Sequence, residues 1–435
     1  METGHIMIPT WMLIPFVCQL LCIAVFPLTK LEHWWEKNMH KLAVSLLLGL
    51  PVAAWLCMHN MTNELEHQMV YDYIPFILLL MALFVITGGI CIKGDLKATP
   101  FVNCSILSVG YLLASFMGTT GAAMLLIRLL LQTNSQRKYT THTVLFFIAM
   151  VANCGGILTP LGDPPLFLLF QKGTPFGWFM GLAPEWLAIG LLLLLVYYIM
   201  DSNFYKRESH ERLKADEAEQ EKITVTGLIN LVWLACVILS TMFVNSTYIP
   251  AMGEHDAPFY LRLLREWAFI LIIILSLLTT QKSVRAANNF AWTPILEVAC
   301  VFCGIFATMI PALMYLQQHP LPITEPWQFV YCTGALSAFL DNAPTAMVFH
   351  TTATTLSDSS AVNLVAGVSE PLLRAISMGA VFFGSLTYIG NGPNFMVKSI
   401  AEQNGFLMPS FFVYMIKFSL IVCLPIFILI QLIFL

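Results

Sequence analysis

The chain has 435 residues, of which 58% are hydrophobic and 11% are charged, and its formal net charge is −4. Soluble globular proteins carry roughly 25% charged residues, so this composition excludes a soluble protein and predicts an integral membrane protein in a lipid bilayer. The small net charge gives no indication of nucleic-acid binding.

Apolar runs follow one another along almost the whole chain. A helix that crosses a bilayer needs about 20 predominantly apolar residues. In chain order, such runs lie at about 9–28, 41–59, 73–92, 142–170, 180–200, 226–247, 266–281, 293–316, 371–398 and 410–434.

Two longer runs, at about 98–133 and 327–357, carry a polar break near the middle. The breaks are Gly118-Thr119-Thr120-Gly121 and Asp341-Asn342-Ala343-Pro344-Thr345. Each arm has about 15 residues, which is short for a full crossing. We therefore predict two re-entrant hairpins whose tips stop within the membrane.

Two short segments, 156–167 and 384–395, align without a gap, and six of their twelve aligned residue pairs are identical. Glycine and proline interrupt an apolar stretch in both segments, which predicts a broken helix in each half of the chain. A membrane tolerates such breaks only where the freed backbone groups line a cavity enclosed by protein. Paired breaks of this kind are typical of secondary transporters.

Lysine and arginine concentrate in the loops on one side of the predicted topology. Cytoplasmic loops are enriched in these residues, so the hairpin at 98–133 is expected to enter from the cytoplasm and the hairpin at 327–357 from outside. We therefore predict an all-α integral protein of the cell (inner) membrane, with two inverted repeats of transmembrane helices that each contain a re-entrant hairpin and a broken helix. The predicted units are a first repeat over 1–200, a charged cytoplasmic linker over 201–225 and a second repeat over 226–435.

Polar side chains at the hairpin tips and helix breaks are the predicted ion and substrate ligands, because oxygen atoms suit a hard cation such as sodium. They are Thr119, Thr120, Thr159, Asp163, Asp341, Asn342, Thr345, Thr387, Asn391 and Asn394. A carboxylate at membrane depth is a functional candidate, and two in one cavity should repel each other, so that one can exchange a proton for sodium. Asp341, Asp163 and Glu297 are the candidate proton-coupling residues. Each aspartate could instead cap its half-helix, and Glu297 could lie at the membrane interface.

The motifs themselves resemble known families. Cys154-Gly-Gly-Ile-Leu-Thr-Pro-Leu-Gly-Asp-Pro-Pro165 and Ser337-Ala-Phe-Leu-Asp-Asn-Ala-Pro-Thr345 resemble the broken helix and a hairpin of NhaD-type sodium/proton antiporters. Gly118-Thr-Thr-Gly-Ala-Ala-Met124 is similar to a hairpin of arsenite-pump permeases, with Thr119-Thr120 where the antiporters usually have Asp-Asn. These families belong to the ion transporter superfamily, which also contains citrate and other carboxylate carriers. By analogy with its members, the resemblance implies a homodimer.

The main interpretation is a secondary active transporter that exchanges sodium or lithium for protons by alternating access, with Na+ and H+ as coupling ions and small inorganic cations as partners. An anionic substrate would need Arg, Lys or bare helix N-termini in the site, whereas two carboxylates are expected there. The alternatives are a cation-coupled citrate or other carboxylate transporter and an arsenite efflux permease, for which Cys300 and Cys303 could supply thiols. The chain has no phosphate-binding loop motif, and we expect neither an enzyme activity nor a cofactor.

Overall fold

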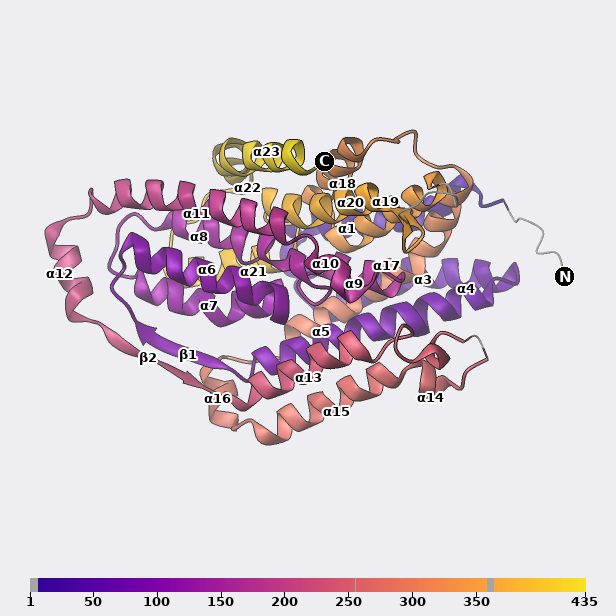
Figure 1. Cartoon of the computed structure of the whole chain (residues 1–435), viewed down its shortest axis with the longest axis horizontal. Coiled ribbons are helices and arrows are strands. Elements are labelled where there is room, and N and C mark those ends of the chain that lie inside the picture. Colours follow the sequence, from indigo (N-terminus) through magenta and orange to yellow (C-terminus); the bar gives the residue numbers. More distant parts are fainter. Residues whose placement is uncertain (1–6, 255, 358–363) are drawn as a thin grey trace.

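A computed structural model describes residues 7–254, 256–357 and 364–435, and most of these residues form helices (Figure 1). The helices up to residue 218 are α1 (Ile14–Val25), α2 (Glu32–Trp35), α3 (Asn38–Met58), α4 (Thr62–Glu66), α5 (Ile74–Thr87), α6 (Pro100–Met117), α7 (Thr119–Thr133), α8 (Thr141–Met150), α9 (Pro164–Gln171), α10 (Phe176–Met180), α11 (Ala183–Tyr205) and α12 (His210–Ala218). The helices that follow are α13 (Ile229–Phe243), α14 (Phe259–Arg262), α15 (Leu264–Thr279), α16 (Lys282–Ala287), α17 (Thr293–Gln318), α18 (Pro326–Phe339), α19 (Asn342–Leu356), α20 (Glu370–Phe383), α21 (Gly392–Gln403), α22 (Phe411–Tyr414) and α23 (Leu424–Phe434).

Four short strands complete the regular structure: β1 (Cys91–Asp95), β2 (Glu221–Thr226), β3 (Leu364–Val365) and β4 (Val368–Ser369). β1 pairs with β2, and β3 pairs with β4, both antiparallel. The prediction of an all-α protein is therefore wrong in this detail, although the described residues are mostly helical.

Seven helical segments within the described ranges are long and apolar enough to cross a membrane. They are Asn38–Met58, Thr62–Thr87, Pro100–Met117, Thr141–Leu158, Phe176–Tyr205, Thr293–Gln318 and Phe411–Phe434. The chain is therefore a multi-pass membrane protein, as its composition predicts.

Two helical hairpins are formed by α6 with α7 and by α18 with α19. Gly118 joins the arms of the first hairpin at φ 81°, a backbone conformation that glycine adopts without strain. The arms have 18, 15, 14 and 15 residues in chain order. The prediction of about 15 residues per arm is too short for α6, because this helix begins directly after its N-cap residue Thr99 and continues to the break.

Both predicted helix breaks are confirmed, and their backbones are alike. After α8 and after α20, a short 3-10 turn leads to an extended threonine, Thr159 at φ −143° or Thr387 at φ −138°. A helix resumes after Asp163 as α9 and after Asn391 as α21, and these two residues are also extended. The internal sequence similarity therefore corresponds to a repeated local conformation.

Glycines at matching positions allow each break to fold tightly on itself. Gly390 lies so close to Gly384 that an added Cβ atom would be 2.6 Å from the Gly384 carbonyl oxygen. A Cβ atom on Gly162 would lie even closer to the carbonyl oxygen of Gly156. This close approach explains why both glycines recur in the two segments.

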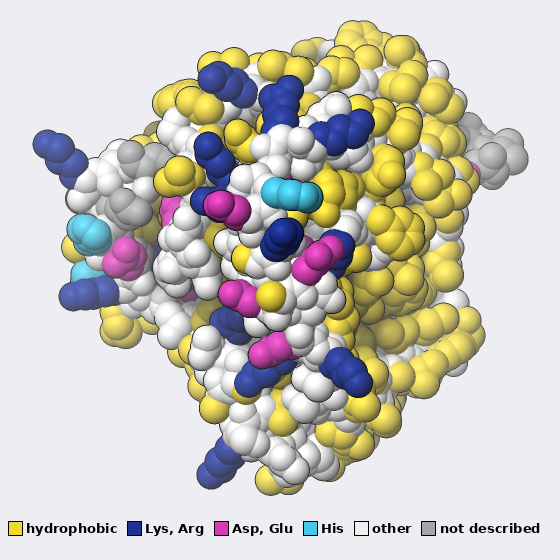
Figure 2. All heavy atoms as spheres, turned by 90° about the vertical axis from the view of Figure 1, so that its left-hand side faces the viewer, with side chains coloured by type: hydrophobic (Ala, Val, Ile, Leu, Met, Phe, Trp, Pro, Cys, Tyr) yellow, Lys and Arg dark blue, Asp and Glu magenta, His cyan; other side chains and the backbone are white. Residues whose placement is uncertain are grey.

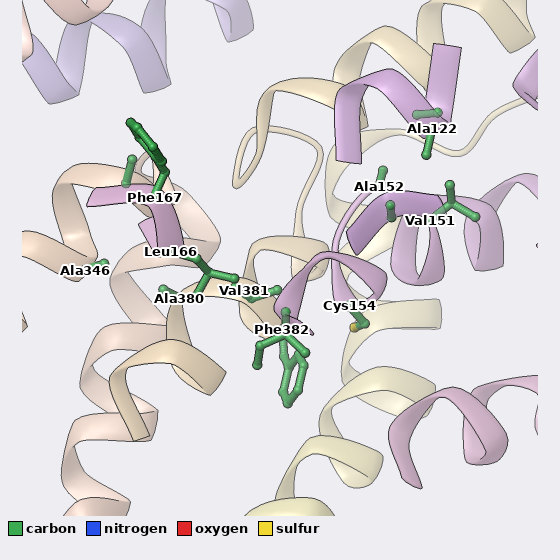
Figure 3. Packing of buried hydrophobic residues seen from close by; sticks show 14 of the residues in the cluster. Ala122, Val151, Ala152, Cys154, Leu166, Phe167, Ala346, Ala380, Val381 and Phe382 are labelled. Atoms are coloured by element: carbon green, nitrogen blue, oxygen red, sulfur yellow. The ribbon is translucent and has the colours of Figure 1, made fainter. Parts of the chain in front are cut away.

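The breaks lie in a hydrophobic core to which both halves of the chain contribute. Figure 3 shows Leu166 of α9 pointing toward Ala380 and Val381 of α20, with Cys154 of the first break nearby. All four side chains are fully buried, and α9 also packs on α19. Elements that are far apart in the sequence therefore hold each other at the centre of the molecule.

The predicted linker is an ordered strap, which we define as residues 206–226. α11 continues to Tyr205, past the predicted boundary at residue 200, and the strap then forms α12 and β2. The buried carboxylate of Asp216 accepts a hydrogen bond from the Ala98 amide at 3.0 Å. A strand can form here because the β-branched residues 223–226 follow the charged run and favour extended structure.

The strap lies at one end of the molecule, on the left in Figure 1. Seen from that end, lysine, arginine and acidic side chains gather on the face, whereas hydrophobic side chains cover the flank beside it (Figure 2). A polar end beside an apolar flank is the distribution that a membrane-spanning protein requires.

Candidate functional site

A cavity of about 120 Å³ lies where the tips of the two hairpins and the two helix breaks come together. These four elements line the cavity mainly with backbone and polar groups, together with the apolar side chains of Met117 and Leu161. The other lining residues from these elements are Gly118, Thr119, Thr120, Gly121, Gly162, Pro164, Asp341, Asn391, Gly392 and Pro393. α5 and α17 contribute an apolar wall to the same cavity, formed by Leu80, Leu83, Phe84, Pro294, Ile295, Val298 and Phe302.

Two helix N-termini line the cavity. α7 begins at Thr119 and α21 at Gly392, and neither helix has a side-chain cap on its first-turn amides. Such amides lack acceptors within their own helix and carry partial positive charge. The Thr119 amide donates to the Gly162 carbonyl at 2.8 Å. Apart from its chain neighbours and its own helix backbone, no atom lies within 4 Å of the place where a Cβ atom of Gly392 would be, so Gly392 borders open space.

The Asp163 carboxylate joins all four elements. Its Oδ1 atom accepts hydrogen bonds from the Thr119 hydroxyl at 2.8 Å and from the side-chain NH2 group of Asn391 at 3.0 Å. Its Oδ2 atom accepts a hydrogen bond from the side-chain NH2 group of Asn342 at 2.5 Å. Asp163 is only 2% exposed. It occupies the N-cap position of α9 without capping that helix through its side chain.

Asn342 beside Asp163 leaves one polar atom unpaired. Its side chain is buried, and its Oδ1 atom has no hydrogen-bond partner among the described residues. A buried acceptor without a donor costs roughly 1–3 kcal/mol. An amide and a carboxylate in contact, with one oxygen free, form a donor set that suits a hard cation.

Asp341 does cap its helix. Its carboxylate accepts a hydrogen bond from the Ala343 amide at 3.0 Å, at the start of α19, and the residue lines the cavity. Asp163 is not among the residues that line the cavity, and its carboxylate contacts Asn342 instead. The cavity therefore carries one carboxylate on its surface, not the two that the sequence predicts.

Four of the other predicted ligands use their side chains to bond backbone carbonyls of the hairpins and helix breaks. The hydroxyls of Thr159 and Thr387 donate to the carbonyls of Ser115 and Ala338 in the adjacent hairpins. Two further predicted ligands bond within their own elements: the Thr345 hydroxyl donates to the Asp341 carbonyl, and the side-chain NH2 group of Asn394 donates to the carbonyls of Gly384 and Thr387. These contacts position the tips and breaks. Thr120, by contrast, borders the cavity.

Glu297 lies apart from these residues. It forms an ion pair with Lys41 of α3 at 2.6 Å, its side chain is 47% exposed, and it does not line the cavity. Cys300 and Cys303 are on the same helix, α17, and do not line the cavity either. Within the described ranges, no group of three or more His, Cys, Asp and Glu side chains could hold a metal ion.

Sequence reasoning missed the apolar wall and Gly392. The wall residues of α5 and α17 lie in ordinary apolar runs, and nothing in those runs marks the side that faces the hairpin tips. Gly392 did carry a signal, because it replaces Pro164 at the aligned position of the second break. That difference indicates a site where the second break leaves more room than the first.

Residues 5–435 match the model of a family described as "Putative citrate transport". No curated protein matches the chain. The family match supports the citrate-carrier alternative from the sequence better than sodium/proton antiport or arsenite efflux. The chain therefore belongs to this citrate transporter family of the ion transporter superfamily, and it is a secondary transporter of the membrane, not an enzyme.

Proposed function

We propose that this protein is a cation-coupled carboxylate transporter that works by alternating access. The observation that carries the proposal is the cavity at which the uncapped N-termini of α7 and α21 meet the carboxylate of Asp341. Helix N-termini bind carboxylates through their amides and their positive dipole ends. In transporters, broken helices present such ends to anionic substrates near the middle of the membrane.

The coupling cation belongs beside this anion site. Asp341 places a negative charge at the cavity, which would repel a carboxylate substrate unless a cation neutralises it. Asp163, Asn342, Asn391 and Thr119 supply oxygen atoms next to that charge. Sodium or a proton bound among these oxygens would make carboxylate binding favourable, so the two species would move together.

Alternating access rests on the repeated architecture. A hairpin and a broken helix occur in each half of the chain, and the lysine and arginine distribution favours opposite orientations for the two halves. We propose that these halves are inverted repeats and that the strap faces the cytoplasm. Single cysteines at Ser209 in the strap and at Thr324, before α18, should then react with an impermeant thiol reagent from opposite sides. Reaction from the same side would contradict the inversion.

The functional test uses purified protein in proteoliposomes. Labelled citrate, succinate and glutarate are tested, and at least one of them should enter in a way that requires an inward sodium or proton gradient. Gly392→Leu should abolish uptake without unfolding the protein, because the new side chain would extend into open space. Failure of every carboxylate to enter, under either gradient, would overturn the proposal.

Sodium/proton exchange is a second candidate, favoured by the buried Asp163 carboxylate and its hydroxyl and amide neighbours. In that case, external sodium or lithium should move protons across the same proteoliposomes with no carboxylate present. Proton movement that needs a carboxylate would instead support the transporter of the main proposal.

A further inference from the structure

The cavity has two chemically different sides, and this difference bears on the substrate. The polar side offers uncapped first-turn amides from Thr120 and Gly121 of α7, but only the Gly392 amide from α21, because the next residue, Pro393, has no amide hydrogen. The other two half-helices are less suited to binding an anion. α9 starts with Pro164-Pro165, which have no amide hydrogen, and the first turn of α19 is capped by Asp341.

The apolar wall has no group that could neutralise an anion. Its surface comes from aliphatic and aromatic side chains of α5 and α17, among them Leu83, Val298 and Phe302. No lysine or arginine is among the described residues that line the cavity. Placing a carboxylate against such a wall removes its water without supplying hydrogen bonds or positive charge, which is strongly unfavourable.

We infer that the transported substrate is a carboxylate with at most two carboxyl groups and an apolar flank, and that the apolar wall of α5 and α17 selects against tricarboxylates such as citrate. The inference rests on the proposed function. The carboxyl groups bind at the N-termini of α7 and α21, and the hydrocarbon part of the substrate packs against Val298 and its neighbours. A third carboxyl group would lie against either the apolar wall or the Asp341 carboxylate, and neither stabilises a negative charge.

The sharpest probes differ only at the central carbon of glutarate. Methyl-substituted glutarate carries an apolar group there, whereas tricarballylate carries a carboxylate at the same place. Burying one methyl group should tighten binding about fourfold relative to glutarate. The unpaired carboxylate of tricarballylate should weaken binding about tenfold or more. Citrate, with the same carboxylate and an added hydroxyl, should behave like tricarballylate.

The experiment measures uptake of labelled glutarate into proteoliposomes and its inhibition by each of the other three acids, with thermal stabilisation of the detergent-solubilised protein as a second readout. Val298→Thr should reduce the preference for the methyl compound over tricarballylate, because it replaces a wall methyl with a hydroxyl at constant size. The matched control is Val232→Thr on α13, where the valine is 52% exposed and lies outside the cavity. This control should leave the preference for the methyl compound over tricarballylate unchanged.

The outcomes separate the two proposals. If none of the four acids is transported or stabilises the protein, the proposed function fails. If citrate or tricarballylate binds as tightly as methyl-substituted glutarate, carboxylate transport stands and the inference about the wall is wrong. An unchanged preference in a folded Val298→Thr protein would likewise overturn the role of the wall.

Discussion

The buried carboxylate of Asp163 connects elements from both halves of the chain through three hydrogen bonds. In Asp163→Asn, the amide oxygen could still accept from Thr119 and Asn391, but the new NH2 group would face the NH2 group of Asn342. We expect this variant to lose about 1–3 kcal/mol of stability. Cation-dependent uptake should also be lost, because no charge remains at this position. Thermal unfolding and uptake against sodium concentration measure the two effects.

The exchange variant Asp163→Asn with Asn342→Asp is the matched control. It restores the donor–acceptor pair, and it restores the negative charge at position 342 in place of position 163. Stability should return, and cation-dependent uptake should return in part. A double variant that is no more stable than Asp163→Asn alone would show that the contact between these two residues contributes little.

Asp341 has two roles at the residue scale, and two substitutions separate them. Asp341→Asn keeps an oxygen for the Ala343 amide and removes the charge, so we expect normal stability and carboxylate binding that depends less on sodium. Asp341→Ala also removes the cap and should cost about 1 kcal/mol. Carboxylate binding measured at several sodium concentrations tests this prediction. An unchanged sodium dependence in Asp341→Asn would leave Asp341 as a helix cap only.

At the scale of the element, each helix break depends on the close approach of two backbone segments. In Gly162→Ala, the added methyl would overlap the Gly156 carbonyl oxygen, a backbone atom that cannot move aside without unfolding the turn. We expect a loss of about 3 kcal/mol or more. Gly390→Ala, with 2.6 Å to the equivalent oxygen, should lose less. Thermal unfolding of the purified variants provides the comparison.

Gly177→Ala is the control for these substitutions. An added methyl at Gly177 in α10 meets nothing within 4 Å, and alanine favours helix, so stability should stay the same or rise slightly. Equal stability of Gly162→Ala and Gly177→Ala would contradict the packing argument for the breaks.

At the scale of the whole molecule, the strap ties the base of the first hairpin to the start of the second half. Its contacts include the pairing of β1 with β2 and the ion pair of Lys97 with Glu217. Acidic side chains also crowd here. Burial raises the pKa of Asp95 in β1, and the carboxylates of Asp216 and Glu219 raise it further. Asp95 therefore binds its proton more tightly in the folded protein than in the unfolded chain.

This shift has a definite sign for stability. A raised pKa in the folded state gives stability that is present at low pH and is lost as the pH rises through that pKa. Asp95→Asn should therefore be more stable than the parent protein at about pH 7.5, and the difference should vanish near about pH 4, close to the ordinary carboxyl range. Thermal unfolding of both proteins across this range measures the difference. A constant difference would show that the charge of Asp95 has no influence on the strap.

The sequence predicted the site at the level of elements but not at the level of side-chain roles. Glycine, proline and polar residues at 118–121, 156–163, 341–345 and 384–391 break the apolar pattern, and each break does occur in the structure. The pattern could not show that Thr159 and Asn394 turn to backbone carbonyls. It also could not show that Glu297 faces Lys41, because hydrogen-bond partners are set by packing between distant segments.

By itself, the sequence determined that this is a multi-pass helical membrane protein with paired breaks, because hydropathy, glycine and proline act locally on the backbone. The tertiary structure decided which groups share the cavity. It set Asp341 and two helix N-termini against an apolar wall from α5 and α17, and it placed Asp163 away from the cavity surface. It also paired β2 of the strap with β1, about 130 residues earlier in the chain. Such contacts depend on burial and geometry between segments far apart in the chain, which a linear pattern does not encode.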